Sequence, residues 1–73
     1  MSMKEIRSEI TGFVWKIVKS AGDAVGEDDA LMILESMKME IPVTPEASGK
    51  IAEIRVRESE AVTQGQVLAV IEA

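Results

Sequence analysis

The chain has 73 residues, a formal net charge of −5, and neither cysteine nor histidine. Lack of cysteine excludes disulfides and thiolate chemistry, and lack of histidine removes the commonest general base and transition-metal ligand. The negative charge disfavours nucleic acids and anionic membranes as partners. We therefore expect one small domain, residues 1–73, without catalytic residues or a metal site: a carrier, adaptor or subunit rather than an enzyme.

Short segments with the composition of β-strands follow one another along the chain, separated by turn residues. In chain order they are residues 4–7, 12–19, 24–25, 31–36, 39–43, 49–56, 61–62 and 67–71. Trp15 is expected to be half-buried on the second strand. Pro42 and Pro45 predict a sheet edge or end for the fifth, because proline cannot donate to a strand ladder.

One segment also fits a helix. Residues 27–40 are mostly good helix formers with an acidic start. The equivalent later segment, 64–73, opens with Gly65 and holds Val67, Val70 and Ile71, which favour a strand. Two halves with one fold must agree, so both segments are predicted to be strands.

The reason for treating the halves together is an internal repeat. Shifted by 37 positions, residues 2–36 fall on residues 39–73 without a gap, with identities that include Gly12/Gly49, Val25/Val62 and Leu31/Leu68. The repeat predicts an all-β fold of two small antiparallel sheets, a flattened barrel or sandwich with pseudo-twofold symmetry. Met37 and Lys38 are the two residues without a counterpart inside this window. Lys38, at the junction of the two halves, is expected near the twofold axis.

The junction of the two halves coincides with a hairpin turn of unusual composition. Strands 31–36 and 39–43 leave Met37-Lys38 as the two residues of the turn. Two-residue hairpin turns prefer Asn-Gly, Asp-Gly or another pair that contains glycine. Local violations of this kind tend to mark functional sites. The plain alternative is an ordinary solubilising lysine on an exposed turn.

The string around this turn, Glu35-Ser36-Met37-Lys38-Met39-Glu40, resembles the attachment motif of biotin carboxyl carrier domains. The resemblance extends from Ile6 to Glu72. It includes the strand-opening glycines Gly12 and Gly49 and a pattern of Val62, Gly65, Gln66 and Leu68. The chain departs from the family at Ser36, where alanine is commoner, and in several turns.

The resemblance implies a biotinyl/lipoyl domain, also called a barrel-sandwich hybrid, that carries biotin covalently on Lys38. Recognition by a biotin protein ligase would then involve Glu35, Ser36, Met37 and Met39. The implied function is a free-standing biotin carboxyl carrier of a biotin-dependent carboxylase, similar to that of acetyl-CoA carboxylase. It would move a carboxyl group between biotin carboxylase and carboxyltransferase partners in the cytoplasm, without catalysing either reaction itself.

Two other functions remain open for this fold. Lipoyl carriers resemble this chain but typically place Asp before the lysine, so methionine on both sides favours biotin. An unmodified adaptor of the same fold is the third possibility. The acidic run Glu27-Asp28-Asp29 lacks calcium-loop spacing. Lys50, Arg55 and Arg57 fit a solvated strand face better than a docking patch.

Overall fold

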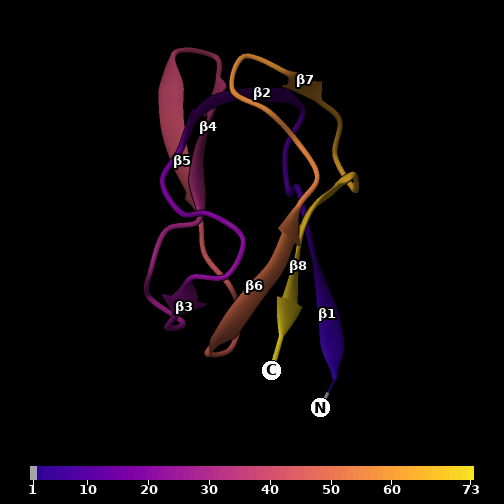
Figure 1. Ribbon diagram of the computed structural model, residues 1–73. Coiled ribbons are helices and arrows are strands. Elements are labelled where there is room, and N and C mark those ends of the chain that lie inside the picture. The colour runs from indigo at the N-terminus through magenta and orange to yellow at the C-terminus, as the bar shows by residue number, and fades with distance from the viewer. Residues whose placement is uncertain (1) are drawn as a thin grey trace.

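The computed structural model describes residues 2–73 as eight β-strands in two four-stranded antiparallel sheets (Figure 1). In spatial order, the first sheet is β1 (Met3–Arg7), β8 (Val67–Glu72), β6 (Gly49–Ile54) and β3 (Ala24–Val25). The second is β5 (Met39–Val43), β4 (Met32–Ser36), β2 (Gly12–Ile17) and β7 (Ala61–Val62). The all-β prediction is confirmed. Residues 27–40 contain no helix, and β2 and β6 end two residues earlier than expected.

The two sheets are related by the same 37-residue shift as the sequence. Adding 37 to the residues of β2 and β3 gives β6 and β7 residue for residue, and adding 37 to β1 and β4 gives positions that overlap β5 and β8 to within a residue or two at their ends. The same shift converts the strand order of one sheet into that of the other. Each sheet therefore takes two strands from each half of the chain. The halves are interleaved, so that neither completes a sheet alone.

The core has the same symmetry, with two clusters of buried apolar side chains. One contains Ile6, Val25, Leu31, Ile51, Ala69 and Ile71, and the other contains Val14, Met32, Leu34, Val56, Val62 and Leu68. Val43 and Ile54 pack against both clusters and join them. Because the inward residues alternate with outward ones, each strand of a sheet leaves one row of side chains on its outer face.

Edge strands and shifts of the pairing register complete the architecture, and one of the three shifts lies between Ile6 and Arg7 in the β1–β8 pairing. β5, which contains Pro42, lies at the edge of its sheet as predicted, and β1 is the equivalent edge of the other sheet. The pairing register shifts between Val14 and Lys16 in β2 and between Ile51 and Glu53 in β6. Each shift is a β-bulge, which inserts an extra residue, Trp15 or Ala52, opposite one residue of the neighbouring strand.

Lys38 does not lie near the twofold axis, and that expectation from the repeat is wrong. The Ser36–Met39 pair at the hairpin base is equivalent to the pair of Ala73 and Ser2, which exchange backbone hydrogen bonds. Figure 1 shows this pair of chain ends at the opposite end of the molecule from the β4–β5 tip. The Cα trace measures 36 × 18 × 18 Å. The twofold operation therefore moves the hairpin turn from one end of the longest dimension to the other. Lys38 lies at one end of the molecule, far from the axis.

Candidate cofactor-attachment site

The turn that carries Lys38 has a left-handed backbone. β4 and β5 pair as far as Ser36 and Met39, which leaves Met37-Lys38 as a two-residue loop. The φ angles of Met37 and Lys38 are 53° and 65°. Positive φ at both central residues is the type I′ geometry that suits the twist of a hairpin. Neither residue is glycine or asparagine, so the turn is held against the ordinary preference of these side chains.

The side chains at the tip are presented to solvent. Met37 is 92% exposed and Met39 is 64% exposed. Lys38 is exposed as well, and within residues 2–73 it takes part in no ion pair. Two large thioether side chains therefore stand beside a free ammonium group. Flexible, polarisable methionine side chains of this kind suit apolar contact with a partner.

The base of the hairpin is tied to the rest of the fold by a short chain of hydrogen bonds. The Ser36 hydroxyl donates to the Thr11 carbonyl oxygen at 3.0 Å. The Gln64 backbone N–H donates to the Thr11 hydroxyl at 3.1 Å. The loop before β2 thus joins the lysine hairpin to the loop between β7 and β8.

Glycine allows the strand beside the hairpin to approach closely. An added Cβ at Gly12 would overlap the Glu35 carbonyl oxygen of β4. The equivalent Gly49 lies against Glu72 of β8 in the same way, where a Cβ would be 2.5 Å from the carbonyl oxygen. The two strand-opening glycines are therefore close-packing residues, one at each end of the molecule.

The five residues predicted from the sequence come together on one hairpin. Ser36 and Met39 form the last strand pair, Met37 and Lys38 form the turn, and Glu35 lies one pair below, opposite Glu40. Sequence reasoning did not find Thr11 or Gln64. Their contacts depend on which strands become neighbours, and the local sequence carries no signal for them.

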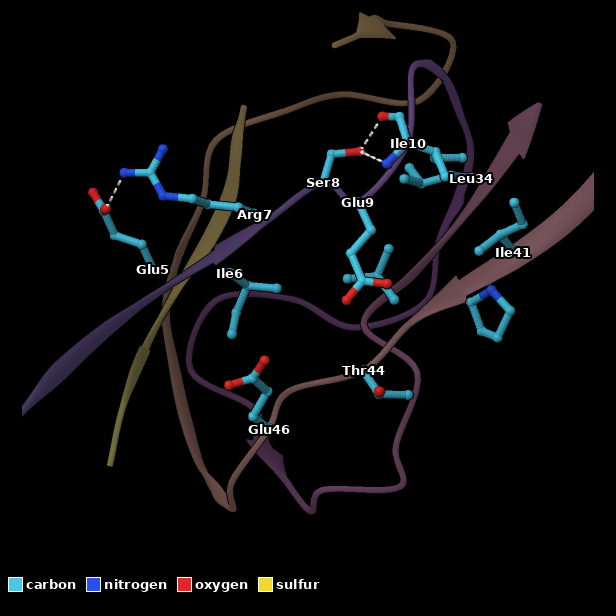
Figure 2. A pocket seen from close by; sticks show the side chains of 12 residues that line it. Glu5, Ile6, Arg7, Ser8, Glu9, Ile10, Leu34, Ile41, Thr44 and Glu46 are labelled. Carbon is cyan, nitrogen blue, oxygen red and sulfur yellow. Dashed lines mark hydrogen bonds and ion pairs between the residues drawn. The ribbon is translucent and has the colours of Figure 1, made fainter. Parts of the chain in front are cut away.

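A recess of about 380 Å³ lies elsewhere, between the edge strands β1 and β5. Figure 2 shows Glu9 and Glu46 pointing into this space from opposite sides. These residues are repeat equivalents, as are Ile6 and Val43 of the same lining, so the twofold axis passes through the recess. Its volume is at the lower end of the range for small-molecule sites. Lys38 does not line it, and the recess is separate from the hairpin tip.

Within residues 2–73 no cluster of three acidic side chains is arranged to hold a metal ion. The same residues include no helix that is long and apolar enough to cross a bilayer. What the hairpin offers chemically is a primary amine on an exposed, well-anchored turn, which can be acylated.

Comparison with known proteins agrees with this geometry. The family model described as "Biotin-requiring enzyme", for biotin and lipoyl attachment, matches residues 2–71. The chain belongs to the biotin/lipoyl attachment family. Such a domain is a carrier, and it typically has no catalytic activity of its own. The family resemblance inferred from the hexapeptide and its flanking glycines is confirmed.

Three similar proteins cover nearly all of this attachment domain. A biotinylated protein TB7.3 homolog of Mycobacterium leprae is 40% identical over 68 residues, which are 93% of this chain and 96% of the relative. The Kluyveromyces lactis urea carboxylase structure matches with a TM-score of 0.92 at 36% identity over 99% of this chain, which spans only 6% of that protein. The lipoyl domain of the Azotobacter vinelandii 2-oxoglutarate dehydrogenase complex matches with a TM-score of 0.76 at 29% identity, covering 93% and 96% of the two chains.

Proposed function

We propose that this domain is a biotin carboxyl carrier, acylated by biotin on the Nζ atom of Lys38. The observation that carries the proposal is the exposed type I′ turn in which Lys38 stands between two exposed methionines. Within residues 2–73 Lys38 is in no ion pair. Its turn lies at one end of the molecule (Figure 1), which leaves room for an acyl group on the amine. The site therefore fits a covalently bound biotinyl group.

In the attachment step, the Lys38 amine loses a proton and its nitrogen forms an amide bond with the carboxyl carbon of biotin. The carboxyl group must arrive activated, as the adenylate that a biotin protein ligase makes from biotin and ATP, and AMP is the leaving group. Lys38 supplies the nucleophile, while Met37, Met39, Glu35 and Ser36 present it to the ligase. The chain has no histidine or cysteine to act as a base. Glu35 and Glu40 flank the turn as strand-surface charges, so we assign the proton acceptor to the ligase.

When bound, biotin supplies a ring nitrogen that can accept a carboxyl group and release it elsewhere. The role of this chain is to hold the attachment point rigidly and to project it. Tethering raises the effective concentration of the attached group at each partner site. The proposed partners are a biotin carboxylase and a carboxyltransferase, in keeping with the name of the urea carboxylase relative. A cytoplasmic location is part of the same proposal.

The decisive experiment is mass spectrometry of the chain after co-expression with a biotin protein ligase in medium containing biotin. We expect one biotinyl increment, on the peptide that contains Lys38. Lys38→Arg keeps the charge and should abolish labelling, whereas Lys50→Arg, an exposed lysine on the other sheet, should be labelled fully. Avidin binding by the Lys38→Arg variant would contradict the assignment.

The same measurement tests the second candidate, a lipoyl carrier. The structural match to a lipoyl domain supports this candidate, because the fold accepts either group. The methionines on both sides of Lys38 favour biotin. A lipoyl increment on Lys38 in cells supplied with both cofactors would replace the biotin proposal.

A further inference from the structure

The outer faces of the two sheets differ strongly at equivalent positions. Phe13, Trp15 and Val18 are 40%, 45% and 47% exposed. Their equivalents 37 residues later are Lys50, Ala52 and Arg55. In residues 2–73, Met3 is the only exposed large apolar side chain outside this face and the hairpin. The exposed apolar surface is thus concentrated on the sheet that carries Lys38.

The outer face of the first sheet, β1-β8-β6-β3, shows that the fold does not require exposed apolar side chains at these positions. At its outer centre, Val70 lies between Glu5 and Glu53 of the neighbouring strands and is only 6% exposed. Arg55 approaches both carboxylates, at 2.6 Å to Glu53 and 3.8 Å to Glu5. Charged side chains thus border the outer row of that sheet.

The lysine-bearing sheet lacks such a cover. Ile33, the equivalent of Val70, lies between Lys16 and Pro42, and Val18 occupies the position of Arg55. The bulge in β2 places both Trp15 and Lys16 opposite Ile33, so both side chains are exposed on the outer face. The aromatic surface therefore remains open to solvent, which is the composition of an interaction surface rather than of a solvated face.

An acidic rim connects this surface to the hairpin tip. Phe13 lies opposite Glu35, which in turn lies opposite Glu40. Like charges directly opposite each other on paired strands destabilise a sheet, and within residues 2–73 neither carboxylate is in an ion pair. At the other end of the molecule, the equivalent Glu72 lies between Lys50 and Met3 instead. The juxtaposed carboxylates are complementary to a basic partner surface.

We propose that the outer face of the second sheet, formed by Phe13, Trp15 and Val18 with the rim of Glu35 and Glu40, is the docking surface for the ligase that acylates Lys38. The complementary ligase surface has an apolar site bordered by arginine or lysine. This inference rests on the proposed function, since it assumes that Lys38 is acylated.

The length of the unmodified lysine side chain favours the ligase over the other proposed partners as the protein that binds this surface. Four methylene groups carry the amine roughly 6 Å from the Cα atom, given ordinary bond lengths. Phe13 is level with Glu35, about two residues or roughly 7 Å below the turn along the strand. An enzyme that reaches the bare amine must come close to the tip and to the face beside it. An acylated arm is longer and lets later partners work at a greater distance.

The test uses the repeat to choose substitutions that the fold accepts at equivalent positions. The triple variant Phe13→Lys/Trp15→Ala/Val18→Arg is compared with the wild-type chain for biotinylation by a purified biotin protein ligase with ATP and biotin. We expect kcat/KM to fall by roughly tenfold or more, as for loss of aromatic anchors in an interface. The control Lys50→Ala/Arg55→Ala, on the other sheet, should stay within about twofold of the wild type, as expected for surface charges outside a contact.

A second variant tests the rim without altering the apolar surface. Glu40→Lys should lower kcat/KM, and rising salt should reduce the difference from the wild type. A triple variant that is folded and labelled at the wild-type rate would overturn the docking surface alone, as would a salt-independent, unchanged rate for Glu40→Lys. An unlabelled wild-type chain would overturn the proposed function itself, and the docking surface with it.

Discussion

The Ser36 hydroxyl donates a 3.0 Å hydrogen bond to the Thr11 carbonyl oxygen and so fastens the base of the lysine hairpin to the loop before β2. The bond has no equivalent at the other end of the molecule, where Ala73 and Ser48 occupy the corresponding positions. The hairpin that carries the proposed attachment site is thus anchored by a contact that the second half lacks.

We expect Ser36→Ala to loosen the hairpin without preventing labelling. Loss of one side-chain hydrogen bond at a partly exposed site should lower the free energy of unfolding by about 0.5–1 kcal/mol. Amide hydrogen exchange at the hairpin base should become faster, since local opening no longer breaks this bond. Ser48→Ala, at the position equivalent to Thr11, serves as the control and should leave exchange there unchanged. Equal exchange rates in the Ser36 variant and the wild type would show that the bond does not restrain the hairpin.

Because the turn has positive φ angles, a substitution at Met37 can make the fold more stable and at the same time slow the labelling of Lys38. Asparagine tolerates positive φ better than methionine does, so Met37→Asn should raise the free energy of unfolding by about 0.5–1 kcal/mol. The same change removes one thioether contact proposed for the ligase, and biotinylation should slow. Met3→Asn, in an extended strand, should bring no gain in stability. Chemical denaturation and a labelling time course measure the two effects, and a less stable Met37→Asn variant would contradict the turn geometry.

The glycines that pack against neighbouring strands allow a matched comparison of the two ends. Gly12→Ala and Gly49→Ala each force a methyl group against a backbone carbonyl oxygen, and overpacking of this kind costs about 1–3 kcal/mol. Thermal melting should show destabilisation of both variants. Only Gly12→Ala displaces Glu35 and the lysine hairpin, so only this variant should also be labelled more slowly when both are assayed well below their melting temperatures. Equal labelling of the two variants would mean that the hairpin position is not critical for the ligase.

Much of the fold and of the site could be predicted because the repeat supplied a second copy of each local pattern. The segment 27–40 is ambiguous alone, and its counterpart at 64–73 resolved it correctly as strand. The Met37-Lys38 turn was identified because its composition is wrong for its position. The composition of the turn is a local signal, whereas the repeat compares segments 37 residues apart.

The features that could not be predicted depend on the order of strands within the sheets. The hydrogen bond between Ser36 and Thr11 forms because β2 lies next to β4. The sequences of the two strands do not predict that they pair. The expectation that Lys38 lies near the axis was wrong because the repeat shows that the two halves are related by a twofold axis but does not show where that axis lies. The contrast between the outer faces also needed the structure, since it depends on which residues point outward beside each bulge.

Ser59 lies in a turn whose equivalent in the first half of the chain has glycine at the same position. Ser59 has a φ of 73°, and its N–H donates to the Val14 carbonyl oxygen at 2.7 Å. Gly22, 37 residues earlier, has a φ of 96°, and its N–H donates to the carbonyl oxygen of Ile51 at 2.8 Å. A Cβ at Gly22 would meet no atom within 4 Å, so a substitution there tests the backbone preference of the residue and not the available space.

Ser59→Gly should therefore stabilise the fold by up to about 1 kcal/mol, the order of the cost of left-handed backbone for a residue with a Cβ, less the entropy that glycine adds to the unfolded chain. Gly22→Ser should destabilise it by a similar amount, and the double exchange should return the midpoint of urea denaturation close to that of the wild type. Labelling of Lys38 should be unaffected in all three variants, because both turns lie outside the hairpin. A loss of stability in Ser59→Gly would show instead that the serine side chain contributes more to the turn than its backbone conformation costs.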